Sequence, residues 1–119
     1  MMRRISHAMR GVRFALQSRE IVGHMVIALV VVFLGVLACL DATRWTLLVF
    51  AIGLVLVAET LNTALEQALN VSGIHHPVIG RSKDLAAAAV LFAALTAGAI
   101  GVFIFAPVGM SGTLAHCLS

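Results

Sequence analysis

The stretch LLVFAIGLVLVAETLNTALEQALN, residues 47–70, begins with twelve residues that carry no polar side chain. Glu59, Asn62 and Glu66 then follow at spacings of three and four, which places them on one face of a helix. Such an apolar run is typical of a helix in a lipid bilayer. Two of the chain's five acidic residues therefore lie where a membrane helix approaches the headgroups, and their presence there needs an explanation.

The amino-acid composition is that of a membrane protein. Hydrophobic residues make up 61% of the 119 residues, compared with about 45–50% in soluble proteins. The mean hydropathy is +1.08. A soluble domain of this length cannot bury so much apolar surface, so the excess must face lipid or other subunits. We expect residues 1–119 to form a single integral membrane domain.

The basic residues lie at the ends of the apolar runs. Arg81 and Lys83 precede the last run, and Arg44 lies with Asp41 between the first two. Five further arginines all precede the first run: Arg3, Arg4, Arg10, Arg13 and Arg19. The isoelectric point of about 9.7 therefore reflects membrane topology, and we expect no nucleic-acid partner.

Residues 1–20, MMRRISHAMRGVRFALQSRE, predict a helix that lies on a membrane surface. Ile5, Met9, Val12 and Leu16 form an apolar stripe, and arginines form the opposite face. A signal peptide is the alternative, but its basic region would be unusually long and no A-x-A cleavage site follows.

Three helical spans are expected after it, at residues 21–40, 45–70 and 85–108. The first, IVGHMVIALVVVFLGVLACL, has twenty residues, which at 1.5 Å per residue cover the roughly 30 Å hydrocarbon core. We expect Pro107 to close the third span. The predicted fold class is an all-α membrane protein, with an N-terminal amphipathic surface helix and three transmembrane helices.

The loops predict the orientation in a cytoplasmic (inner) membrane. The short segment 41–44 has one basic residue and is expected outside, whereas segment 70–84 carries Arg81 and Lys83 and is expected inside. The chain would then be a multi-pass protein with its N-terminus inside and its C-terminus outside.

Glu59 is the residue that most strongly suggests a function. It follows Trp45 by fourteen residues, which is about 21 Å along a helix and within the inner leaflet. A carboxylate at that depth costs roughly 2.5–3.5 kcal/mol on insertion scales, and intramembrane acids are functional by default. The alternative is a polar seam that only specifies helix packing. Glu66 lies about 10 Å further along, near the cytoplasmic surface.

Lys83 and Asp84 are expected opposite this polar face, at the start of the third span. A structural role would have Asp84 cap the helix and Lys83 extend to the headgroups. In the functional interpretation, Lys83 and free amides at the helix start hold phosphate oxygens, and Glu20 lies at the same interface. These groups suit Mg²⁺–ATP, although the sequence contains no Walker A motif or kinase glycine loop. Three helices do not easily enclose such a site, so we expect oligomers.

The segments AETLNTALEQALN (58–70) and HHPVIGRSKDLAAAAVL (75–91) resemble the prokaryotic diacylglycerol kinase and undecaprenol kinase family. The resemblance implies a small three-span homotrimer whose active sites are shared between subunits. It implies that Glu59 is the catalytic base, with Asn62 as the neighbouring active-site amide.

The same resemblance assigns the nucleotide and metal ligands. Lys83 and Asp84 would bind ATP together with the loop histidines His75 and His76. Glu66 would bind Mg²⁺, and Glu20 corresponds to the second metal carboxylate.

Two positions depart from the family pattern. Asn70 stands where the family usually has an aspartate, which bears on how active the site is. Counted from Gly11, Glu20 falls one residue later than the family's carboxylate, at a position rotated by about 100° on a helix.

The leading hypothesis is an ATP-dependent lipid kinase that phosphorylates a lipid hydroxyl at the cytoplasmic interface. The sequence does not choose between diacylglycerol and undecaprenol. A catalytically inactive membrane partner and a small proton-coupled transporter are the alternatives. No inverted repeat supports the transporter.

Overall fold

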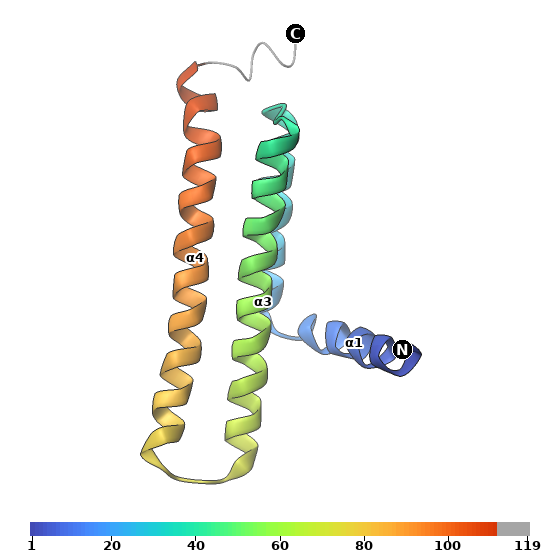
Figure 1. The fold of residues 1–119 in the computed structure, drawn as a ribbon, viewed down its shortest axis with the longest axis vertical. Coiled ribbons are helices and arrows are strands. Elements are labelled where there is room, and N and C mark those ends of the chain that lie inside the picture. Colours follow the sequence, from blue (N-terminus) through green and yellow to red (C-terminus); the bar gives the residue numbers. More distant parts are fainter. Residues whose placement is uncertain (112–119) are drawn as a thin grey trace.

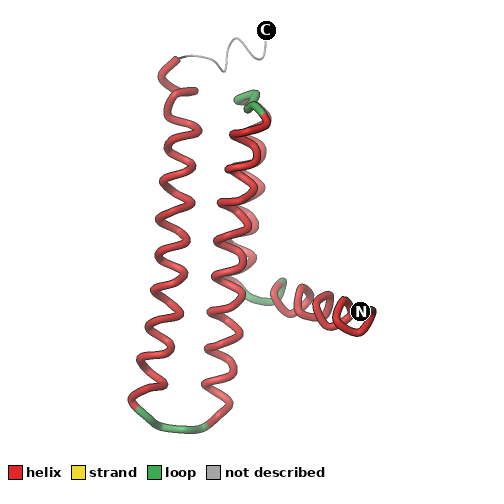
Figure 2. Tube along the Cα trace, viewed as in Figure 1, coloured by secondary structure: helices red, strands yellow, loops and turns green. Residues whose placement is uncertain are grey.

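The computed structural model describes residues 1–111, and these residues form four α-helices and no strand. They are α1 (Met2–Ala15), α2 (Arg19–Leu37), α3 (Ala42–Ser72) and α4 (Pro77–Ser111). The last three run alongside one another as a long up-and-down bundle, and α1 projects from its side (Figures 1 and 2). Each of the three is long and apolar enough to cross a membrane. The predicted fold class is confirmed.

Helix α1 is shorter than the predicted surface helix and stands apart from the bundle. It contains no buried residue, and its apolar stripe, including Met9 and Val12, is exposed. The chain leaves the helix after Ala15, and Ser18 adopts an extended conformation as the N-cap of α2. Glu20 therefore belongs to the first turn of α2. Our expectation that the N-terminal helix continues to residue 20 is wrong, because this extended residue interrupts it.

The turn between α2 and α3 is tightly packed. The carboxylate of Asp41 accepts a hydrogen bond of 2.9 Å from the backbone N–H of Arg44 and so caps the start of α3. The indole of Trp45 lies against Gly35, where an added Cβ would come within 2.9 Å of the ring. A glycine at position 35 is thus required for α2 and α3 to approach each other this closely.

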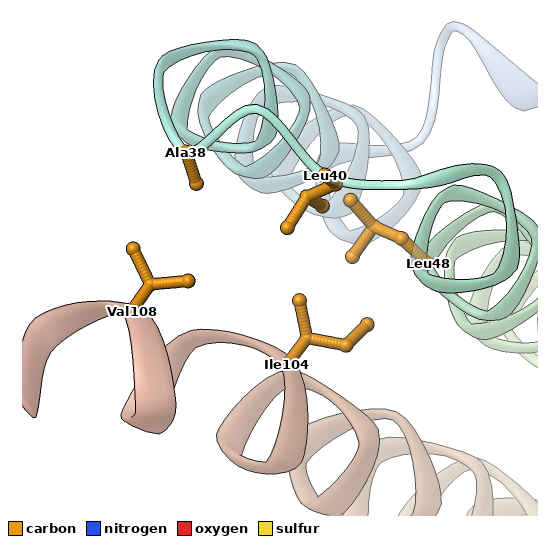
Figure 3. Packing of buried hydrophobic residues seen from close by; sticks show 5 residues of the cluster. All are labelled: Ala38, Leu40, Leu48, Ile104 and Val108. Carbon is orange, nitrogen blue, oxygen red and sulfur yellow. The ribbon is translucent and has the colours of Figure 1, made fainter. Parts of the chain in front are cut away.

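The buried apolar core lies at this same end of the bundle, which we call the turn end. Its five members come from the end of α2, the turn, α3 and α4, and they meet between the helices in Figure 3: Ala38, Leu40, Leu48, Ile104 and Val108. Elsewhere most large apolar side chains of the described residues are exposed, for example Leu29, Phe33 and Phe103. A single chain therefore leaves its apolar surface for lipid or other subunits to cover.

The loop between α3 and α4, the opposite or loop end, is only four residues long. Helix α3 ends at Ser72, and Gly73 adopts a left-handed conformation with φ of 66° that stops it. Pro77 begins α4, a position that suits proline because its missing N–H needs no partner there. The ring Nδ1 of His76 accepts a 3.1 Å hydrogen bond from the N–H of Val78 and caps the helix.

This short loop corrects two sequence-based expectations. Lys83 and Asp84 lie inside α4, beyond its first turn, so Asp84 does not cap the helix and Lys83 does not share the free amides of its start. Pro107 does not end α4, which continues to Ser111. Membrane helices tolerate proline because neighbouring groups satisfy the freed carbonyl. The tail that the sequence predicts to face outward lies, from residue 112 onward, outside the described residues.

Candidate active site at the loop end of the bundle

Glu59 is the one charged side chain that is buried among the described residues, with 7% of its surface exposed. It lies on α3 and faces α2. Its Oε1 is 2.9 Å from Nε2 of His24, which lies on α2, so the pair connects two helices. Glu59 was predicted from the sequence to be a site residue, whereas His24 was not. His24 could have been selected from the sequence, because it is an ionisable side chain inside an apolar span.

The rest of the polar face continues along α3 toward the loop end. The side-chain amide of Asn62 donates a long hydrogen bond of 3.4 Å to Oε1 of Glu66. The side-chain oxygen of the same Asn62 is buried and has no hydrogen-bond partner among residues 1–111. A buried acceptor without a partner usually marks a bound water or ion, or a functional role. Glu66 itself is exposed.

Glu20 approaches this face from the junction of α1 and α2. A surface cleft there is lined by residues of α1, the junction and α3, and it includes Glu20, Thr63 and Gln67. Ser18 donates a 3.0 Å hydrogen bond to Oε2 of Glu20. The carboxylate is exposed, and the cleft that it lines includes Thr63 and Gln67 of α3, which precede and follow Glu66 in the sequence, but not Glu66 itself. Glu20 and Glu66 therefore lie at a similar level of the bundle.

Lys83 lies at the loop end, where it joins α4 to α3. Its ammonium group donates a hydrogen bond to the side-chain oxygen of Asn70. A second cleft is lined by Lys83 together with His75 and His76 of the loop. Asp84, the next residue, is exposed. The structure thus brings together the lysine and the histidines that the sequence analysis assigned to one ligand.

The candidate residues form a series along the bundle rather than one closed pocket. Glu59 and Asn70 are eleven residues apart on α3, about 16.5 Å at 1.5 Å per residue, and Glu66 lies between them. Helix α1 joins the bundle at the level of Thr63 and Gln67, so α3 and α4 extend past it (Figure 1). Among residues 1–111, no group of three or more His, Cys, Asp or Glu side chains is placed to hold a metal ion alone.

Comparison with known proteins gives a consistent result. A family model described as prokaryotic diacylglycerol kinase matches residues 6–105. The undecaprenol kinase of Bacillus subtilis (strain 168) is 35% identical over 103 residues, which cover 85% of this chain and 84% of that protein. The diacylglycerol kinase of Escherichia coli (strain K12) is 38% identical over 66 residues, which cover 52% of this chain and 54% of that protein.

Proposed function

This chain belongs to the prokaryotic diacylglycerol kinase family and is a lipid kinase, and from that premise we propose that it transfers the γ-phosphoryl group of ATP to a lipid hydroxyl. The lipid is diacylglycerol or undecaprenol. The observation that carries the proposal is the buried Glu59, a carboxylate held inside the bundle one helical turn from Asn62, whose side-chain oxygen is buried and has no hydrogen-bond partner among the described residues. A single domain, residues 1–119, performs the reaction.

Glu59 serves as the general base. Its Oε1 is engaged by His24, and its Oε2 remains for the lipid hydroxyl. As the hydroxyl oxygen forms a bond to the γ-phosphorus, its proton passes to Glu59 and the bond to the β–γ bridging oxygen breaks, which releases ADP. Asn62 orients the hydroxyl, since its side-chain oxygen has no other partner within the described residues.

Lys83, His75 and His76 bind the nucleotide. They line one cleft at the loop end, where the lysine ammonium meets phosphate oxygens and the histidines contact the rest of ATP. Asp84 lies beside this cleft and orients the nucleotide. Lys83 is already held by Asn70, so little side-chain freedom is lost when phosphate binds.

Glu66 and Glu20 are the ligands of Mg²⁺. Carboxylate oxygens fit this ion, which commonly takes one or two carboxylates and completes its shell with phosphate oxygens and water. Within the part of the chain that the structure describes, Glu20 and Glu66 are not part of a closed metal cage, which agrees with an ion that arrives with ATP. When bound, the ion neutralises charge that develops on the transferred phosphate.

The reaction takes place at the cytoplasmic surface of the inner membrane. If α1 lies in the interface plane, Glu59 is on the membrane side of that plane and Lys83 on the aqueous side. The arginines of α1 and the pair Arg81 and Lys83 favour the cytoplasm for this end, with the N-terminus inside and the C-terminus outside. The exposed apolar surface and the open site support a homotrimer with sites shared between subunits.

The test is phosphate transfer from γ-labelled ATP with Mg²⁺, measured for diacylglycerol and undecaprenol in parallel micelles. We expect label in one lipid, and we expect Glu59→Gln to lower kcat by at least 100-fold, as loss of a general base typically does. The matched control is Asp41→Asn, an acid-to-amide change at the turn end that still allows capping of α3.

The possible results separate the hypotheses. Label in neither lipid, with a folded and oligomeric protein, would support the catalytically inactive partner. Full activity of Glu59→Gln would remove the general-base role and leave the kinase assignment in place. Equal loss in Asp41→Asn would attribute the effect to folding.

A further inference from the structure

We propose that His24 is a positioning residue of the kinase, whose ring orients the carboxylate of Glu59 toward the lipid hydroxyl. The inference rests on the proposed role of Glu59 as the general base. His24 does not touch the reacting atoms in this arrangement, and it acts through the carboxylate.

The geometry of the pair defines the bond. Nε2 of His24 lies 2.9 Å from Oε1 of Glu59, a normal hydrogen-bond length. A general base must be ionised, and an ionised carboxylate only accepts hydrogen bonds, so in the proposed role of Glu59 the Nε2 atom of His24 carries the hydrogen and donates it. The two residues are 35 positions apart and come from α2 and α3, so the contact fixes one helix relative to the other as well as the carboxylate.

Glu59 depends on this contact for its orientation. His24 is its hydrogen-bond partner within the described residues, and Asn62, one turn away, directs its amide to Glu66 instead. A glutamate has three rotatable side-chain bonds, and without a donor the carboxylate has no polar group to hold it. With Oε1 occupied, the orientation of Oε2 is set for the substrate.

Among the described residues, no other polar side chain lines the groove that His24 borders. The ring borders a groove of about 320 Å³ between α2, α3 and α4, and the other residues that line this groove are apolar, among them Ile27, Ala28 and Val55. The His24 side chain is 31% exposed and the Glu59 side chain 9%, so the histidine is the more exposed member of the pair. Because the other residues along the groove are apolar, the hydrogen bond to Glu59 is the polar contact that fixes the His24 ring.

The experiment compares two substitutions of His24 in the full-length protein. His24→Leu removes the donor, whereas His24→Gln keeps an N–H donor at a similar distance from the backbone. We expect His24→Leu to lower kcat about 100-fold with KM for ATP unchanged, because a misplaced catalytic group costs on that order. We expect His24→Gln to stay within about threefold of the parent. Met25→Leu, at the neighbouring exposed position, controls for changes on α2 as such.

A second readout is independent of turnover. With ¹⁵N-labelled histidine, the Nε2 resonance of His24 should move when Glu59 is replaced by Gln. The oligomeric state and unfolding of His24→Leu should match those of His24→Gln.

Full activity of His24→Leu, or equal loss of activity in the His24→Leu and His24→Gln variants, would overturn the inference and leave the lipid kinase assignment in place. If the parent protein transfers no label from ATP to either lipid, the proposed function is wrong, and the inference fails with it.

Discussion

Gly35→Ala is predicted to weaken the packing of the turn end without disabling the site. The added methyl group would lie 2.9 Å from Cη2 of the Trp45 ring and 3.2 Å from Cδ1 of Leu40, both closer than a normal contact. Trp45 packs against the buried cluster and Leu40 is 8% exposed and belongs to it, so a shift of either side chain would disturb that packing.

Two opposing terms set the magnitude. Overpacking a close contact costs typically about 1–3 kcal/mol. Alanine is better than glycine within a helix by about 0.8–1.0 kcal/mol, which offsets part of that cost. The net loss is therefore about 0–2 kcal/mol on these central values. A reference glycine in open space isolates the contact: at Gly53 of α3 nothing lies within 4 Å of an added Cβ. We expect Gly53→Ala to be more stable than Gly35→Ala by about 1–3 kcal/mol.

The assay is unfolding in mixed micelles by increasing dodecyl sulfate, followed by far-ultraviolet circular dichroism. Trp45 is the chain's one tryptophan, so its fluorescence reports the same contact locally. In a Trp45→Phe background the ring atoms that collide are absent, and most of the cost of Gly35→Ala should disappear. The reasoning is refuted if Gly35→Ala is as stable as Gly53→Ala in the parent background.

Three further predictions concern the polar contacts. Lys83→Met should raise KM for ATP by at least about 10-fold, because a hydrogen bond to a charged group contributes about 1.5–3 kcal/mol. Steady-state kinetics at varied ATP concentration measures this KM, and an unchanged value would exclude Lys83 from the nucleotide site. Asn70→Asp turns the contact with Lys83 into an exposed ion pair of about 0.2–1 kcal/mol, so KM for ATP should rise by no more than about fivefold and the change should shrink in high salt. Asp41→Ala removes the N-cap of α3 and should cost about 1 kcal/mol in the unfolding assay with kcat unchanged, whereas Asp41→Asn should keep stability.

The helical spans were predictable because hydropathy is a local property of the sequence. Residues 21–40 and 47–58 leave little alternative to membrane helices, and these helices are present. The start of α4 was not predictable in the same way. The polar stretch 70–84 has the composition of a loop, yet Pro77 and the cap from His76 begin a helix there. Lys83 is consequently held by Asn70 on the neighbouring helix.

The candidate site was predictable where its residues share one helix. Glu59, Asn62 and Glu66 have helical spacing, so their common face follows from the sequence alone. The pairing of Glu59 with His24 depends on how α2 is rotated relative to α3. Neither segment contains a sequence pattern that predicts this rotation. Glu20 shows the same limit, because a break at Ser18 moved it from the surface helix to the start of α2.

The position of the buried apolar cluster has a consequence for how this molecule tolerates change. Leu48 of that cluster and Glu59 are eleven residues apart on α3, about 16.5 Å, so the buried cluster and the proposed catalytic carboxylate lie at different levels of the bundle. Substitutions separated by more than about 10 Å usually have additive effects on stability. Engineering can therefore stiffen the turn end to make the protein withstand harsher detergents, while the loop end is altered separately to accept a different lipid.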